Sequence, residues 1–179
     1  MPSSLVAEPW ATIAAEARRE SPLWAAALRP DDERELEPVF SPLAEPRFAL
    51  GLETIYEGYL LHFGRPRLFA PPDADTAILL GDYLYAHGLV RVAAFEEVAA
   101  VADLADLISL CSQVAADGRD GDGEAWAATA ALLGEGELDD ARAALRLGGD
   151  PAPLAALARA AAGVEAVERS LAAHRLRLR

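Results

Sequence analysis

Hydrophobic positions along most of the chain recur every three to four residues, which is the period of an amphipathic helix. The clearest stripe lies within residues 95–117. It comprises Val98, Val101, Leu104, Ala105, Ile108 and Cys111. No stretch alternates apolar and polar residues for long enough to predict a strand. The pattern therefore predicts an all-α protein built as a helical bundle.

Proline divides this pattern into two parts, because ten of the twelve prolines precede Asp73. A proline either starts a helix or breaks one, so the first part should consist of short helices joined by corners. The helices expected there are residues 9–20, 22–28, 31–37 and 46–63, with residues 38–46 as an extended connector. We accordingly divide the chain into a proline-rich N-terminal helical arm, residues 1–46, and a helical bundle core, residues 47–179.

The second part has longer periodic stretches. Asp73 or Asp75 is placed to cap a helix that runs to about Ala94. The segment 117–123, with sequence DGRDGDG, is the clearest loop, and we expect it to be flexible and acidic. The other helices expected are residues 95–117, 124–133, 137–147 and 151–176, of which the last two could form a hairpin.

Charge and composition exclude several classes of protein. The 179 residues include 29 acidic residues and 16 basic ones, all of them Arg, which gives a net charge of −13. This charge disfavours nucleic-acid binding, which needs a basic surface. No uninterrupted apolar run reaches about 18 residues and no signal peptide is visible, so we expect a cytoplasmic protein without a membrane span. A single cysteine, Cys111, excludes an internal disulfide and fits a buried small residue.

The segment 51–88 carries the most specific pattern in the chain. Gly64-Arg65-Pro66 is followed by a helix that contains Gly81-Asp82 within AILLGDYLYA. These blocks and their separation resemble the trans-polyprenyl diphosphate synthases, a family of the isoprenoid synthase fold. Counting back from Gly64, the family's DDxxD motif falls on residues 53–57, where only Glu53 and Glu57 are acidic.

The resemblance implies a shortened isoprenoid synthase bundle, but the family's chemistry is incomplete in this chain. Family members ionise an allylic diphosphate with Mg²⁺ ions held between two Asp-rich motifs. Here the central acidic pair is lost, the second motif has no counterpart, and no lysine is present to hold diphosphate. We therefore expect a non-catalytic polyprenyl-synthetase-like protein, either a partner subunit or a prenyl-diphosphate-binding protein. Two alternatives stay open: a reduced but active Mg²⁺-dependent prenyltransferase, and an unrelated helical adaptor.

The candidate site residues follow from this comparison. Glu53 and Glu57, spaced i,i+4 on one helix face, are the candidate Mg²⁺ ligands. The candidate ligand-binding residues are Arg65, Asp82, Tyr56 and Tyr59. No catalytic residue can be assigned, because no nucleophile motif and no phosphate-cradling glycine loop is present.

Other polar residues have simpler interpretations. We expect Asp82 to pair with Arg65 or Arg91 as a structural contact, because a carboxylate in an apolar helix is costly without a partner. His62 and His87 have no third ligand at a metal-binding spacing, so we interpret them as ordinary hydrogen-bonded side chains.

The expected partners are a second copy of the chain or a full-length prenyl synthase, with a prenyl diphosphate as a possible ligand. If the resemblance has functional content, Glu53, Glu57 and Asp82 should line one cavity between long helices.

Overall fold

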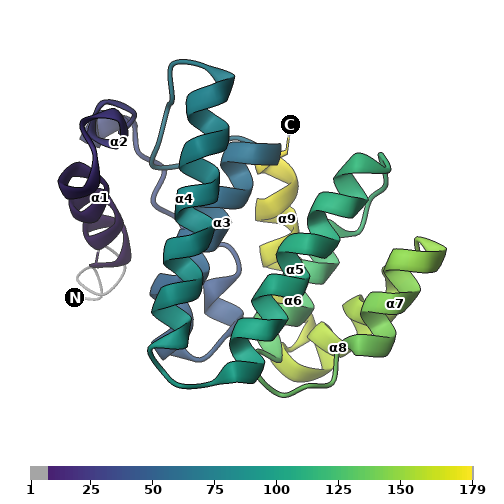
Figure 1. The fold of residues 1–179 in the computed structure, drawn as a ribbon. Coiled ribbons are helices and arrows are strands. Elements are labelled where there is room, and N and C mark those ends of the chain that lie inside the picture. Colours follow the sequence, from purple (N-terminus) through teal and green to yellow (C-terminus); the bar gives the residue numbers. More distant parts are fainter. Residues whose placement is uncertain (1–7, 179) are drawn as a thin grey trace.

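The computed structural model describes residues 8–178, and within them every regular element is a helix (Figure 1). No strand occurs in this range, and the single extended pairing is an isolated bridge between Leu28 and Phe69. The all-α prediction is confirmed. The α-helices are α1 (Glu8–Glu20), α2 (Pro22–Ala26), α3 (Ala49–Phe63), α4 (Ala74–Ala93), α5 (Val98–Ala116), α6 (Asp122–Ala131), α7 (Asp139–Gly148), α8 (Ala152–Ala162) and α9 (Val164–Arg177). The short 3-10 helices are η1 (Asp31–Glu33), η2 (Ser41–Leu43) and η3 (Pro46–Phe48).

Helices α3 and α4 form an antiparallel pair that is closely packed at two levels. Gly51 faces Gly88 at one level, and Gly58 faces Gly81 at the other. A Cβ atom on Gly58 would lie 2.9 Å from the carbonyl oxygen of Gly81, and one on Gly88 would lie 3.0 Å from that of Gly51. The absence of a side chain at these positions therefore lets the two backbones approach each other.

The first two helices pack against one side of this pair, as Figure 1 shows. Helix α1 buries residues spaced i, i+3, i+4 and i+7, which is the apolar face of an amphipathic helix. These are Trp10, Ile13, Ala14 and Ala17, and they join a core cluster with Leu61, Leu80 and Leu84 of α3 and α4. The N-terminal helices are thus part of the same bundle as the helices that follow.

The larger core lies on the other side of the pair and is centred on α6. Every residue from Gly123 to Ala130 except Glu124 is buried there. Helices α5, α8 and α9 each contact α6, and the many alanines on α6 allow them to approach closely. Trp126 is the large side chain of α6, and its ring stacks on that of Phe40 with the two ring centroids 5.6 Å apart.

Most predicted helices are confirmed, and the capping of α4 follows the prediction. Asp73 is the N-cap residue, and its carboxylate accepts a hydrogen bond of 2.7 Å from the backbone N–H of Thr76. The helix predicted over residues 31–37 is wrong beyond η1. The segment after η1 is extended because the backbone N–H of Glu35 donates to the carbonyl oxygen of Arg67, and the Arg67 side chain donates to the carbonyl oxygen of Glu37.

Two boundaries in the second half also differ from the prediction. The helix predicted over residues 151–176 is two helices, α8 and α9, which meet at Gly163 with φ of 86°. Few residues other than glycine adopt this backbone conformation, so the glycine marks the corner. Helix α6 begins at Asp122, two residues earlier than predicted, which shortens the acidic loop to residues 117–121.

Helix α5 has the length and mean hydropathy, 1.5, of a membrane-crossing segment. Core helices of soluble proteins have the same length and hydropathy, so these two properties are weak evidence that α5 spans a membrane. Part of α5 is buried in the bundle, where Asp103 pairs with Arg142 of α7 at 2.9 Å and accepts the backbone N–H of Gly134 at 2.8 Å. The structure thus shows a long apolar helix where the sequence had predicted no possible span.

Candidate functional site

The two candidate Mg²⁺ ligands, Glu53 and Glu57, lie on one face of α3, as their spacing predicted, and this face points into the core. Both are buried, with exposed fractions of 2% for Glu53 and 0% for Glu57. Between them lies the guanidinium of Arg67, which is also fully buried. Its Nη1 atom lies 2.8 Å from Glu53 Oε2, and its Nε atom lies 3.2 Å from Glu57 Oε2.

The remaining carboxylate oxygens of this ionic cluster are occupied as well. Glu57 Oε1 accepts backbone N–H groups from Arg67 at 2.8 Å and from Leu68 at 2.7 Å. Glu53 Oε1 accepts a hydrogen bond from the Ser41 hydroxyl. Glu57 thereby holds the backbone of residues 67–68 against α3, and Glu53 connects α3 to η2 through the Ser41 hydroxyl.

Aromatic rings enclose the guanidinium of Arg67. Its central carbon lies 4.3 Å from the ring centroid of Trp10 and 4.8 Å from that of Tyr56. Burial opposes the charge of Arg67, but the adjacent Glu53 and Glu57 carboxylates raise its pKa above the ordinary value. Arg67 is therefore a permanent cation held by two carboxylates and two aromatic faces.

This arrangement leaves no vacant carboxylate oxygen for a metal ion. A Mg²⁺ ion needs about six oxygen ligands, which it takes from carboxylates, phosphates and water. At Glu53 and Glu57 it would have to displace Arg67 from a site without solvent. No group of three acidic, His or Cys residues is placed to hold a metal within residues 8–178.

Asp82, the third candidate acid, lies apart from the ionic cluster. Its side chain is 67% exposed, and its Oδ1 atom lies 3.2 Å from Nε2 of His62. The predicted pairing with Arg65 or Arg91 is wrong, because Arg91 pairs with Glu16 of α1 and Arg65 lies near Glu35. The three acids therefore do not line one cavity, and Asp82 avoids the cost of burial by facing solvent rather than by pairing with arginine.

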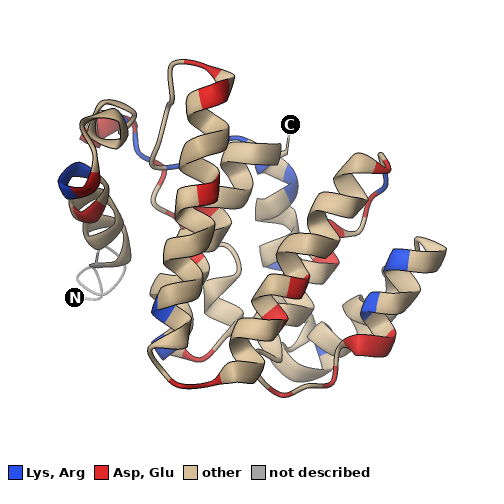
Figure 2. Ribbon diagram, in the orientation of Figure 1, with Lys and Arg blue, Asp and Glu red and all other residues tan. Residues whose placement is uncertain are grey.

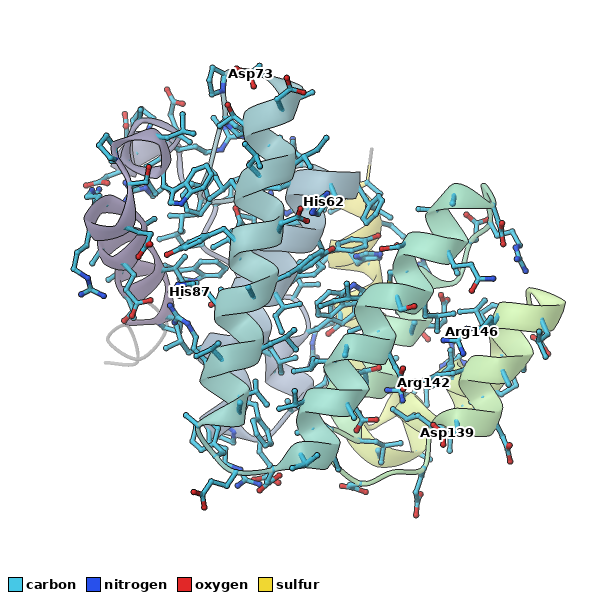
Figure 3. The ribbon with its side chains drawn as sticks, in the orientation of Figure 1. His62, Asp73, His87, Asp139, Arg142 and Arg146 are labelled. Carbon is cyan, nitrogen blue, oxygen red and sulfur yellow. The ribbon has the colours of Figure 1, made fainter. Side chains whose placement is uncertain are left out.

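Figure 3 places His62 on α3 beside α4, and His87 on the side of α4 that faces α1. His87 Nδ1 lies 4.0 Å from the Glu16 carboxylate. The histidines thus belong to separate helix contacts.

A second polar network joins α3, α6 and α9. His174 is buried, with its Nδ1 atom 2.9 Å from the Tyr56 hydroxyl and its Nε2 atom 2.9 Å from Asp122 Oδ2. Because a carboxylate only accepts, Nε2 donates to Asp122, and in the neutral ring Nδ1 accepts from Tyr56. The Tyr59 hydroxyl donates to the same Asp122 oxygen. Tyr56 and Tyr59, candidate ligand-binding residues, thus orient a His–Asp pair.

The ionisation of this network is fixed by its neighbours. Burial opposes the charge of Asp122, yet hydrogen bonds from His174 and Tyr59 lower its pKa below the ordinary value. Burial raises the pKa of Tyr59, and the charge of Asp122 raises it further. Asp122 is consequently a carboxylate and Tyr59 a neutral phenol at neutral pH.

A cavity of about 200 Å³ opens beside Tyr59 and Asp122. Its lining residues come from α3, α5, α6, the loop before α6 and the end of α9. They are Tyr59, Phe63, Cys111, Val114, Ala115, Arg119, Asp120, Asp122 and Leu178. Cys111 is buried as predicted, and burial raises the pKa of its thiol.

Sequence reasoning missed Arg67, Asp122 and His174, because each derives its role from a distant part of the chain. Arg67 follows the Gly-x-Pro turn, and its position there was the one available signal. Asp122 resembled a loop acid, and His174 lies in a cationic stretch typical of a solvated helix end.

No family model matches the chain, and neither a curated protein nor a solved structure matches it. The functional argument therefore depends on the geometry of the ionic cluster, the Tyr–His–Asp network and the exposed faces.

Proposed function

We propose that the protein is a non-catalytic polyprenyl-synthetase-like subunit that acts by binding a full-length prenyl synthase. The observation that carries this proposal is the position of Arg67, whose guanidinium lies between the two glutamates that would otherwise hold Mg²⁺. The Arg67 guanidinium occupies the position that Mg²⁺ would take, so Glu53 and Glu57 stabilise the fold rather than take part in a reaction.

The electrostatics of this site also argue against ionisation of an allylic diphosphate. That reaction needs metal ions and basic side chains arranged around two phosphate groups. The guanidinium of Arg67 is already paired with both Glu53 and Glu57, which leaves the ionic cluster with one more carboxylate than it has cations. A diphosphate would be repelled from this part of the bundle.

An exposed apolar face supports the binding role. Helices α4 and α5 present large apolar side chains to solvent, and Figure 2 shows few charged residues along their ribbons. These residues are Ile78, Leu79, Val90 and Val98, each at least half exposed. A contiguous exposed apolar patch is a feature of protein–protein contact surfaces, and we take these four residues as the candidate contact surface.

Melting curves with Mg²⁺ and farnesyl diphosphate test the absence of a metal–diphosphate site. We expect the melting temperature to be the same with Mg²⁺, with farnesyl diphosphate and with both together. A rise that requires both components would overturn the non-catalytic assignment and favour the reduced prenyltransferase, because ligands that bind only the native state raise its stability.

Co-purification with the full-length prenyl synthase of the same host tests the partner. We expect a complex that Val90→Glu and Val98→Glu each disrupt, because a charge on the α4–α5 face would be buried at the interface. Leu147→Glu on α7 is the matched control, since Leu147 is equally exposed but lies on another helix. A chain that stays monomeric with every such synthase would instead indicate the unrelated adaptor, and a homodimer disrupted by the same two variants would identify a second copy as the partner.

A further inference from the structure

The cavity beside Asp122 combines an apolar wall with one oriented carboxylate. Phe63, Val114 and Leu178 supply apolar lining, and Asp122 supplies a carboxylate whose side chain is 18% exposed. A concave site with an apolar lining and a few fixed polar groups is the usual form of a small-molecule site.

The carboxylate of Asp122 is held in place from behind. Both Tyr59 and His174 donate to its Oδ2 atom. The Oδ1 atom accepts no hydrogen bond from another side chain in the part of the chain that the structure describes. Oδ2 is thus anchored in the bundle, the backbone N–H of Asp122 also hydrogen-bonds to its own carboxylate, and Oδ1 is the oxygen without a side-chain donor.

The charges around the opening favour a cation. Asp120 and Asp122 both line the cavity. The single basic residue there, Arg119, is neutralised by an ion pair with Asp117, and its Nη1 atom lies 3.5 Å from the carbonyl oxygens of Leu145 and Arg146. The opening therefore carries net negative charge, within a protein whose own net charge is −13.

The aromatic lining is suited to the same kind of ligand. Tyr59 and Phe63 both line the cavity, and their ring centroids are 5.3 Å apart. Aromatic faces attract ammonium groups, and the attraction is stronger where water is excluded. The volume of about 200 Å³ lies below the usual range of roughly 300–1,000 Å³ for small-molecule sites, so we consider a compact ligand.

We propose that this cavity binds a small primary alkylammonium ion, with the ammonium group on Asp122 Oδ1 and the alkyl group against Phe63, Val114 and Leu178. The proposal is independent of the subunit role, because neither the ionic cluster nor the α4–α5 face contributes to the cavity.

Binding titrations with n-butylammonium, followed by calorimetry or NMR, test the proposal on the full chain. n-Butanol and butyrate have similar size but carry no charge or a negative charge. We expect saturable binding of n-butylammonium and none of the other two. Equal binding of n-butanol would overturn the assignment of a cation site, since the apolar wall alone would then explain the binding.

Two variants on α5 locate the site without disturbing the Tyr–His–Asp network. Ala115 lines the cavity and is exposed, whereas Ala116 is exposed on the same helix and does not line it. We expect Ala115→Phe to abolish n-butylammonium binding by filling the cavity, and Ala116→Phe to leave it unchanged. Binding that survives Ala115→Phe would overturn the proposed location.

The Asp122→Asn variant tests the role of the carboxylate. It removes the negative charge while keeping a side chain of nearly the same size, and we expect affinity to fall roughly tenfold or more, as for the loss of a charged hydrogen bond. Unchanged affinity in the folded variant would overturn the role of Asp122. If this variant fails to fold, the comparison of Ala115→Phe with Ala116→Phe still decides whether the cavity is the site.

Discussion

The buried guanidinium of Arg67 is the group whose removal should destabilise the fold most. Arg67→Met keeps most of the side-chain volume but leaves the Glu53 and Glu57 carboxylates without a counter-charge in a site that water does not reach. Removing one partner of a buried ion pair costs about 3–5 kcal/mol. Because Arg67 serves two carboxylates and the carbonyl oxygen of Glu37, we expect a value at the upper end of that range.

Urea unfolding followed by circular dichroism measures this loss. With a denaturant slope of about 2 kcal/mol/M, a loss of 4–5 kcal/mol lowers the unfolding midpoint by roughly 2 M. Arg67→Lys keeps the charge but loses the planar fork that reaches both glutamates, so we expect a smaller loss of about 2 kcal/mol. Arg169→Met is the control, because the exposed pair of Arg169 with Glu165 should contribute less than about 1 kcal/mol.

A loss below about 1 kcal/mol for Arg67→Met would refute the reasoning. It would mean that the two glutamates accommodate the change by protonation or by admitting water. The same result would weaken the functional proposal, since a replaceable Arg67 could also be replaced by a metal ion.

Three further results are expected from the network, the helix pair and α7. Asp122 has a lowered pKa in the folded chain, so its contribution to the free energy of unfolding is complete above pH about 4 and declines as the pH falls through that lowered pKa. Urea unfolding midpoints measured from pH 2 to 7 should therefore fall less steeply at acid pH in Asp122→Asn than in the unmodified protein. Gly88→Ala should destabilise by about 1–3 kcal/mol, because its Cβ would lie 2.3 Å from a side-chain carbon of α3, whereas Gly148→Ala, with open space around it, should change the melting temperature little. Asp103→Asn should cost about 2–4 kcal/mol in urea unfolding, because it removes the nearest and most buried of the three carboxylates around the buried Arg142.

Local signals in the sequence were sufficient for most of the helices. The Asp73 cap and the apolar periodicity of α1, α4 and α5 depend on residues that are close in the sequence. Such features can be recognised without knowledge of the tertiary fold. The extended segment after η1 was missed because its conformation is imposed by Arg67, about 30 residues away. The corner at Gly163 was missed because the alanine-rich sequence around it favours helix strongly enough to hide a single glycine.

The candidate site was predictable only in part, and for a related reason. The i,i+4 spacing of Glu53 and Glu57 places them on one face of α3, and the structure shows them together. Whether such a pair binds a metal or an internal cation depends on which charge the tertiary fold brings to it. Arg67 arrives there because the turn after α3 folds back over the helix, a path that helical periodicity does not encode.

The glycine contacts between α3 and α4 also limit how the length of this segment can change. Gly51 and Gly58 are seven residues apart, and so are Gly81 and Gly88, which places about two turns between the contacts on each helix. Inserting or deleting one residue between them would rotate one glycine of the pair by about 100° and drive a side chain into the opposing backbone. Insertions and deletions should therefore be tolerated in the loops around this helix pair and excluded from the stretch between its glycines.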